Sequence, residues 1–157
     1  MKTLVVYYSL EGNTEFIAQQ VADKSGADIF KLEPQKEFPK QGFKKYFWGG
    51  KSVIFGEKPP LKNTTPDLNL YDSIYIGTPV WSGSFAPPVN TFLSQNSFEN
   101  KQISLFACHG GGGADKCFEK IKSRLAKDTV VKTIDFQDPL HAEKDEVLNK
   151  IDAWLHA

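Results

Sequence analysis

Short runs of consecutive hydrophobic residues recur along the chain and alternate with segments of helical periodicity. The first run, Thr3–Tyr8, combines β-branched and aromatic side chains and predicts a strand buried on both faces. Further runs of this kind predict the remaining strands, at Asp28–Leu32, Ser73–Gly77, Gln102–Cys108 and Thr129–Phe136. The chain is therefore expected to contain a sheet of five strands.

Amphipathic segments that alternate with these strands predict four helices. In the first, Asn13 and Thr14 can cap the N-terminus, and Gly26 stands where a left-handed C-terminal cap is expected. The second helix is expected to begin at Pro87–Pro88 and the third at Asp115. The last helix is expected to carry an apolar stripe over Val147–Leu155. This alternation predicts a parallel sheet covered by helices on both faces, a three-layer α/β/α sandwich.

One long segment, residues 33–66, departs from the alternation. It contains the crossover between the second and third strands, and part of Gly42–Trp48 can be its helix, but Gly49–Gly50 and Pro59–Pro60 interrupt any long helix. We expect a largely irregular segment that packs through its aromatic residues, Phe43, Tyr46, Phe47 and Trp48. The length of 157 residues is that of one domain, predicted to span 1–157.

Composition and charge exclude several classes of protein. Lysine and arginine number 19 and acidic residues 19, so the formal net charge is zero, without the basic excess of a nucleic-acid-binding protein. The apolar run near the N-terminus is too short to span a membrane and does not have the pattern of a signal peptide, so a cytoplasmic location is expected. Cys108 and Cys117 are expected to be reduced, buried thiols, because two cysteines are too few for a disulfide framework.

The loops after the first, third and fourth strands are the candidate ligand sites, because ligands bind such sheets beyond the carboxyl ends of the strands. The first loop, Ser9-Leu10-Glu11-Gly12-Asn13-Thr14, brings hydroxyl and amide groups to a helix N-terminus, where free N–H groups favour an anion. It predicts a phosphate cradle with Glu11 facing solvent, although an ordinary capped helix start has the same composition. The loop lacks the lysine of a P-loop and the glycines of a dinucleotide-binding turn.

The second and third loops carry an aromatic residue and a run of glycines. The second, Gly77-Thr78-Pro79-Val80-Trp81-Ser82-Gly83-Ser84, holds a tryptophan that can cover a flat aromatic ligand or fill the core beneath a turn. The third, Cys108-His109-Gly110-Gly111-Gly112-Gly113, is costly in backbone entropy, which close approach of the main chain to a ligand would compensate. Its histidine is either a packed loop residue or a group with a direct catalytic role.

The three loops together resemble the FMN-binding loops of the flavodoxin family, through Ser9-x-x-Gly12-Asn13-Thr14, Gly77-x-Pro79-x-Trp81-x-Gly83 and His109-Gly110-Gly111. The resemblance implies a five-stranded sheet in the order 2-1-3-4-5, with FMN where the strand order reverses between strands one and three. It also implies that Ser9–Thr14 bind the FMN phosphate, that Pro79–Gly83 flank the isoalloxazine with Trp81 against it, and that His109–Gly112 line its far edge.

Three functions are compatible with such a domain. The first is an electron carrier between a reductase and a protein or small-molecule acceptor; its zero net charge departs from the strongly acidic surface typical of carrier flavodoxins. The second is an NAD(P)H-dependent oxidoreductase acting on a quinone or similar acceptor, with lysines near the nucleotide phosphates: Lys36, Lys40, Lys44, Lys45 or Lys51. The third is a flavin-binding module without turnover. A phosphate-bearing ligand other than a flavin is a further alternative.

Overall fold

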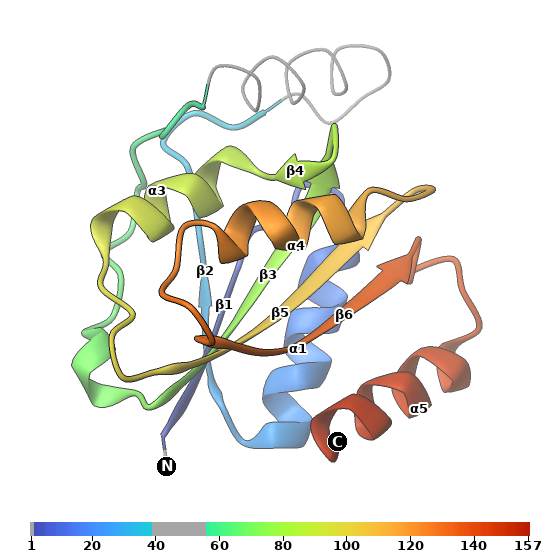
Figure 1. The fold of residues 1–157 in the computed structure, drawn as a ribbon. Coiled ribbons are helices and arrows are strands. Elements are labelled where there is room, and N and C mark those ends of the chain that lie inside the picture. The colour runs from blue at the N-terminus through green and yellow to red at the C-terminus, as the bar shows by residue number, and fades with distance from the viewer. Residues whose placement is uncertain (1, 39–55) are drawn as a thin grey trace.

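The computed structural model describes residues 2–38 and 56–157 (Figure 1). Within them a six-stranded sheet has the order β2-β1-β3-β5-β6, and the short strand β4 pairs with β3 outside this order. The strands are β1 Thr3–Tyr7, β2 Asp28–Lys31, β3 Ser73–Trp81, β4 Ser84–Phe85, β5 Gln102–His109 and β6 Val130–Gln137. All pairings along this path are parallel. Since β5 and β6 are the fourth and fifth predicted strands, the predicted order 2-1-3-4-5 is confirmed, and β4 is a sixth strand that was not predicted.

Helices cover both faces of this sheet and complete three layers (Figure 1). On one face lie α3 (Pro87–Gln95) and α4 (Ala114–Lys122), and on the other lie α1 (Asn13–Ser25) and α5 (Lys144–Leu155). A short 3₁₀ helix at Leu68–Leu70 precedes β3. The predicted three-layer α/β/α sandwich is confirmed.

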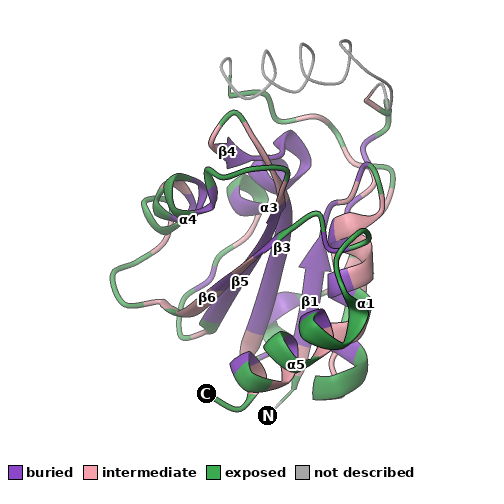
Figure 2. Ribbon diagram, turned by 90° about the vertical axis from the view of Figure 1, so that its right-hand side faces the viewer, coloured by how far each residue is buried: buried purple, intermediate pink, exposed green. Residues whose placement is uncertain are grey.

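Alternate residues of the central strands enter two separate hydrophobic cores. In β1, Leu4 and Val6 join the core beneath α3 and α4, whereas Val5 and Tyr7 join the core beneath α1 and α5. Figure 2 shows burial concentrated along the strands and on the inner sides of the helices. Burying each such side chain contributes about 1.5–3 kcal/mol to folding, so a strand that is hydrophobic at every position stabilises both layers.

β3 is longer than the sequence predicted. The expectation of a loop directly after Gly77 is wrong, because Thr78, Pro79, Val80 and Trp81 continue the strand. Pro79 has no N–H group to donate, but β1 pairs with β3 only as far as Gly77, and beyond it the parallel ladder continues with β5 alone. Proline is tolerated at such an edge. β4 then folds back on Val80 and Trp81 as an antiparallel hairpin.

The described parts of residues 33–66 are irregular, and they are held together at their ends. An antiparallel bridge joins Pro34 to Leu61, and the Lys62 N–H donates to the Glu33 carbonyl at 2.7 Å. We call these four residues the base clamp. Outside the described residues lie the helix expected within Gly42–Trp48, the aromatic cluster Phe43, Tyr46, Phe47 and Trp48, and the lysines Lys40, Lys44, Lys45 and Lys51.

The single arginine of the chain, Arg124, has a structural role in the returning part of this segment. Its guanidinium donates to Asn90 Oδ1 at 2.6 Å, and the Asn90 amide in turn donates to the carbonyls of Gly56 and Glu57, both at 3.1 Å. The neighbouring Thr91 hydroxyl donates to the Pro59 carbonyl at 2.7 Å. Arg124 therefore orients a buried amide of α3 that fixes the chain where it re-enters the fold.

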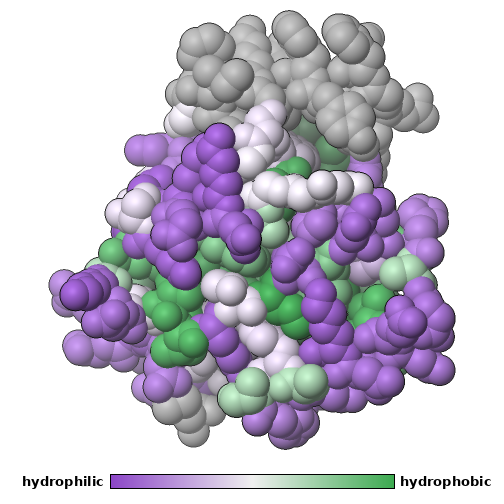
Figure 3. Space-filling model, turned by 45° about the vertical axis from the view of Figure 1, so that its right-hand side comes forward, coloured by the Kyte–Doolittle hydropathy of each residue, from purple (hydrophilic) through white to green (hydrophobic). Residues whose placement is uncertain are grey.

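The described residues place only scattered hydrophobic side chains at the surface. On the face seen in Figure 3, hydrophobic areas are small and separated by hydrophilic side chains. The large hydrophobic residues that are exposed among the described ones are Ile29, Leu70, Val131 and Leu140. In the part of the chain that the structure describes, no helix combines the length and the apolar character that a membrane crossing requires.

A methyl group at Gly77 is predicted to destabilise the fold. A Cβ there would lie 2.1 Å from Cζ of Phe106, its buried partner on the adjacent strand β5, so Gly77→Ala should lower the free energy of unfolding by about 1–3 kcal/mol through overpacking. The same change at Gly111, where a Cβ meets nothing within 4 Å, is the matched control. Urea unfolding of both variants measures the difference, and equal midpoints would contradict the packing described for Gly77.

Candidate functional site

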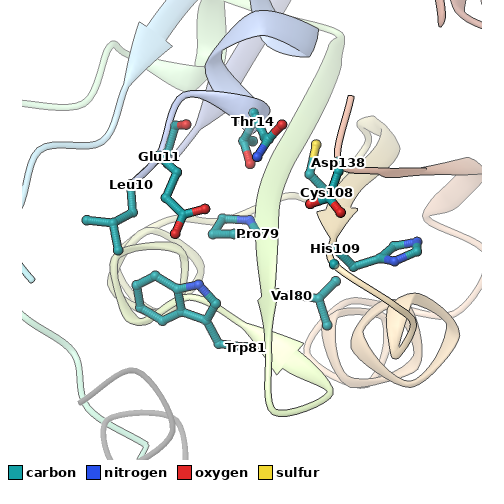
Figure 4. Close-up of a pocket in the computed structure, with 12 residues that line it drawn as sticks. Leu10, Glu11, Thr14, Pro79, Val80, Trp81, Cys108, His109 and Asp138 are labelled. Atoms are coloured by element: carbon teal, nitrogen blue, oxygen red, sulfur yellow. The ribbon is translucent and has the colours of Figure 1, made fainter. Parts of the chain in front are cut away.

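A hollow lies at the carboxyl ends of β1, β3 and β5, where the three predicted loops meet (Figure 4). Each loop contributes to its wall, and the lining residues are Ser9, Leu10, Glu11, Asn13, Thr14, Pro79, Val80, Trp81, Cys108, His109, Gly110 and Asp138. The structure thus brings together segments that the sequence singled out separately.

The first loop places a helix N-terminus at one end of the hollow. The expectation that Asn13 or Thr14 caps α1 is wrong: Gly12 is the N-cap, with a left-handed φ of 102°, and no side chain makes the capping bond. Gly12 N–H donates to Ser9 Oγ at 3.1 Å, which closes the turn. The backbone N–H groups of the first helical turn have no partner within the helix and are available to an anion.

Two side chains of the first turn have distinct surroundings. Thr14 is 1% exposed, yet it lines the hollow beside the Cys108 thiol. Asn13 Oδ1 accepts the N–H of Leu140 at 3.0 Å, which ties the loop after β6 to the start of α1. Asn13 therefore holds a neighbouring loop in place, and Thr14 keeps a hydroxyl at the floor of the site.

Charge in the lining is acidic rather than basic. No lysine or arginine is among the described residues that line the hollow, whereas Glu11 and Asp138 are. Glu11 is exposed, as expected, but Figure 4 shows its carboxylate directed toward Trp81 and away from Thr14. An anion at the helix N-terminus would therefore be bound by amide and hydroxyl donors, with this carboxylate at the opposite side.

Trp81 lies at the other end of the hollow, near the tip of the β3–β4 hairpin. Its indole packs edge-on against Tyr8, with ring centroids 5.9 Å apart, and against Phe38 at 5.4 Å. The indole thus packs against an aromatic cluster at the edge of the core and also forms part of the wall of the hollow, and its contact with a flat aromatic ligand stays a prediction. Ser82 and Gly83, both with left-handed φ, make the tight turn of the hairpin.

Several predicted residues support the site without lining it. Thr78 is fully buried, and its hydroxyl accepts the Ala86 N–H at 2.9 Å, which fixes the entry into α3. A Cβ at Gly113 would approach Gly83 Cα to 3.3 Å, so the hairpin tip and the glycine loop are in close backbone contact. The other predicted residues outside the lining are Gly12, which borders an adjacent cavity, and Ser82, Gly111 and Gly112.

His109 reaches the site through its backbone rather than its ring. It is the last residue of β5, and Figure 4 shows the imidazole turned away from Thr14, Pro79 and Trp81. Nε2 lies 2.7 Å from Asp135 Oδ2, and Nδ1 accepts the Gly112 N–H at 2.9 Å. Of the two alternatives for His109, the structure therefore favours a packed residue of the loop.

Two residues of the loop after β6 were missed by sequence reasoning. Asp138 lines the hollow, and its N–H donates to the His109 carbonyl at 2.9 Å. Leu140 packs beside Gly12, where a Cβ would lie 3.4 Å from Leu140 Cδ1. The Asp-Pro pair at 138–139 marks a turn in the sequence. Nothing local shows that this turn reaches across to α1, because the contact joins positions 127 residues apart.

Comparisons with known proteins agree with this architecture. A family model described as flavodoxin matches residues 2–150. A protein of Bacteroides uniformis is similar with a TM-score of 0.81 and 23% identity, over 96% of this chain and 97% of that one. A flavoprotein of Lactobacillus acidophilus, solved in complex with FMN, is similar with a TM-score of 0.75 and 22% identity over 98% of both chains. A WrbA-like flavodoxin of Agrobacterium tumefaciens is similar with a TM-score of 0.62 and 15% identity over 98% of both chains.

The thiols are predicted to be unreactive in the folded protein. Both cysteines are free and buried, as expected, and burial raises the pKa of Cys108 to about 12, against an opposing hydrogen bond with Thr14. Burial likewise raises the pKa of Cys117 to about 12. Since the thiolate is the reactive form, Ellman's reagent at pH about 8 should label neither residue until the protein is unfolded.

The same pKa shifts predict how stability depends on pH. The unfolded thiols lose their protons near pH 9.0 while the folded ones keep theirs, so the free energy of unfolding should fall as the pH rises from about 9 toward 12. Cys117→Ala isolates Cys108 in the labelling assay. Fast labelling of that native variant would contradict a buried, protonated Cys108.

Proposed function

This chain belongs to the flavodoxin family, and from that premise we propose that it binds FMN and carries electrons between a reductase and an acceptor. One observation carries the proposal: the three loops converge on a single hollow, with a helix N-terminus at one end and an indole at the other. An anionic group and a flat aromatic group are thereby accommodated at opposite ends of one site, as a flavin mononucleotide requires.

At the end of the hollow proposed for the phosphate, the hydrogen-bond donors are uncharged groups. The first-turn N–H groups of α1 and the Thr14 hydroxyl supply hydrogen-bond donors, and the positive end of the helix dipole favours negative charge. Gly12 brings the main chain close, since its left-handed φ suits a residue without a Cβ. Arg124 is engaged by Asn90 in another part of the fold, and the described residues that line the hollow include no lysine, so their donors to a phosphate are amides and hydroxyls.

The ring end combines an aromatic wall with exposed main chain. Trp81, Pro79 and Val80 present one wall from β3, and Gly110 presents backbone from the opposite loop. Tyr8 and Phe38 hold the indole from behind, which limits its freedom to rotate. A rigid aromatic surface beside polar backbone is the arrangement expected for a stacked isoalloxazine whose edge accepts or donates hydrogen bonds.

The residues around the hollow bind and orient rather than react. Bound FMN supplies the transfer of one or two electrons. The Cys108 thiol stays protonated at neutral pH because burial raises its pKa to about 12, and the His109 ring nitrogens are both engaged outside the hollow. The contribution of this chain is therefore to hold the cofactor, exclude water from one face and leave an edge open, which suits a carrier.

Partner contacts of such a carrier would be brief. The hydrophobic residues exposed in residues 2–38 and 56–157 are scattered, and the net charge of zero gives little long-range steering. An obligate complex would instead need a large apolar interface. We infer that a redox partner protein or a small-molecule acceptor approaches the open side of the hollow and leaves after transfer.

FMN binding by matched hydroxyl variants tests the cofactor assignment. Thr14→Ala removes a donor at the phosphate end and should raise the Kd for FMN roughly 10- to 100-fold, the cost of a hydrogen bond to a charged group. Ser25→Ala removes a hydroxyl that donates to Val21 at the far end of the same helix and should leave the Kd unchanged. Fluorescence titration of the apoprotein measures both. A wild-type protein that does not bind FMN would overturn the proposal.

An anaerobic titration separates the carrier from the NAD(P)H-dependent oxidoreductase. We expect FMN-loaded protein to stay oxidised when NADH or NADPH is added, and to bleach only when a flavodoxin reductase is also present. Rapid bleaching of the oxidised flavin band by either nucleotide alone would favour the oxidoreductase. Lys36 is the one residue of the predicted lysine set that the structure describes, so Lys36→Ala would then test that site first.

A further inference from the structure

We propose that His109 is a positioning residue: its imidazole, braced by Asp135, fixes the glycine loop that bounds the ligand hollow. The proposal deepens the proposed function, on which it rests wherever FMN serves as the probe. Its structural part, the hold on Gly112, is independent of any ligand and can be measured on the free protein.

The hydrogen bonds define one tautomer of the ring. Nδ1 accepts the Gly112 N–H at 2.9 Å, so this nitrogen carries a lone pair and no proton. The proton of the neutral imidazole is then on Nε2, which donates to Asp135 Oδ2 at 2.7 Å. The ring itself is 9% exposed, whereas its two partners, Asp135 and Gly112, lie at the surface. Asp135 therefore selects the tautomer that can hold Gly112.

The loop has few other means of staying in place. Residues 110–113 are all exposed glycines with no side chain to pack, and a Cβ at Gly111 or Gly112 would meet nothing within 4 Å. Gln137 Nε2 donates to the Gly110 carbonyl at 3.1 Å, and the imidazole of His109 accepts the Gly112 N–H. These two side chains restrict a segment with exceptionally high conformational freedom, and His109 is the one that holds Gly112.

Fixing Gly112 has consequences on both sides of it. Gly110, two residues before, lines the hollow. Gly113, one residue after, is the N-cap of α4 and lies against Val80 and Gly83 of the hairpin. A loop released at Gly112 would therefore alter the backbone at the ring end of the site and loosen the contact that positions the Trp81 hairpin.

A matched pair of ion-pair variants separates positioning from general destabilisation. Asp135 is 47% exposed and pairs with His109, while Asp152 is 46% exposed and pairs with Lys24 at 2.8 Å between α1 and α5. His109→Ala and Asp135→Ala should raise the Kd for FMN roughly tenfold, the effect of one lost hydrogen bond, and shift the midpoint potential. Asp152→Ala should change neither, although it also removes an ion pair.

A conservative variant tests the specific role of the ring. His109→Asn supplies a side-chain oxygen that can accept the Gly112 N–H, so it should recover the affinity that His109→Ala loses. Unchanged Kd and potential in His109→Ala would overturn the proposal, as would equal effects of Asp152→Ala.

Measurements on the free protein keep this proposal distinct from FMN binding. Nitrogen NMR of the imidazole should show an unprotonated Nδ1 and a protonated Nε2, and hydrogen exchange at the Gly112 amide should be faster in His109→Ala than in wild type. If wild type fails to bind FMN, the proposed function fails while these results still decide the role of the ring. The opposite tautomer, or unchanged exchange, would overturn the proposal even in a protein that binds FMN.

Discussion

The parallel pairing of β1 with β3 constrains the rest of the structure. β1 lies inside the sheet with β2 on one side and β3 on the other. The segments that follow β1 and β3 lead to α1 and α3 on opposite faces of the sheet, and a crevice forms between them. The N-terminus of α1, the end of β3 and the glycine loop after β5 surround this crevice. The position of the site is therefore a property of strand order, and side chains determine only what it can hold.

Much of this architecture was predictable because each buried strand is hydrophobic at consecutive positions. β1 packs alternate residues into two cores, and the resulting run is visible in the sequence without any structure. The extension of β3 was not predictable in the same way. Gly77 and Pro79 are residues that usually interrupt a strand, and only the tertiary arrangement shows that Gly77 is covered by Phe106 and that Pro79 stands where β1 has ended.

The candidate site was predictable as a set of segments and less so as a set of side chains. Ser9, Thr14 and Trp81 line the hollow as the sequence led us to expect, but Thr78 is turned into the protein and the ring of His109 is turned away from the hollow. Side-chain direction depends on strand register and on partners such as Asp135, which is 26 residues from His109 in the chain. Asp138 was missed because its position beside the first loop depends on a long-range contact that leaves no local pattern.

The base clamp gives this domain a point of variation. Glu33, Pro34, Leu61 and Lys62 join the two ends of one crossover. A chain closed at its base can change in length at a small entropic cost, because closure entropy grows only slowly with the number of residues enclosed. Evolution, or an engineer, can therefore lengthen or shorten the enclosed segment, provided that Phe38 keeps its contact with Trp81 and that residues 56–59 keep their hydrogen bonds to α3.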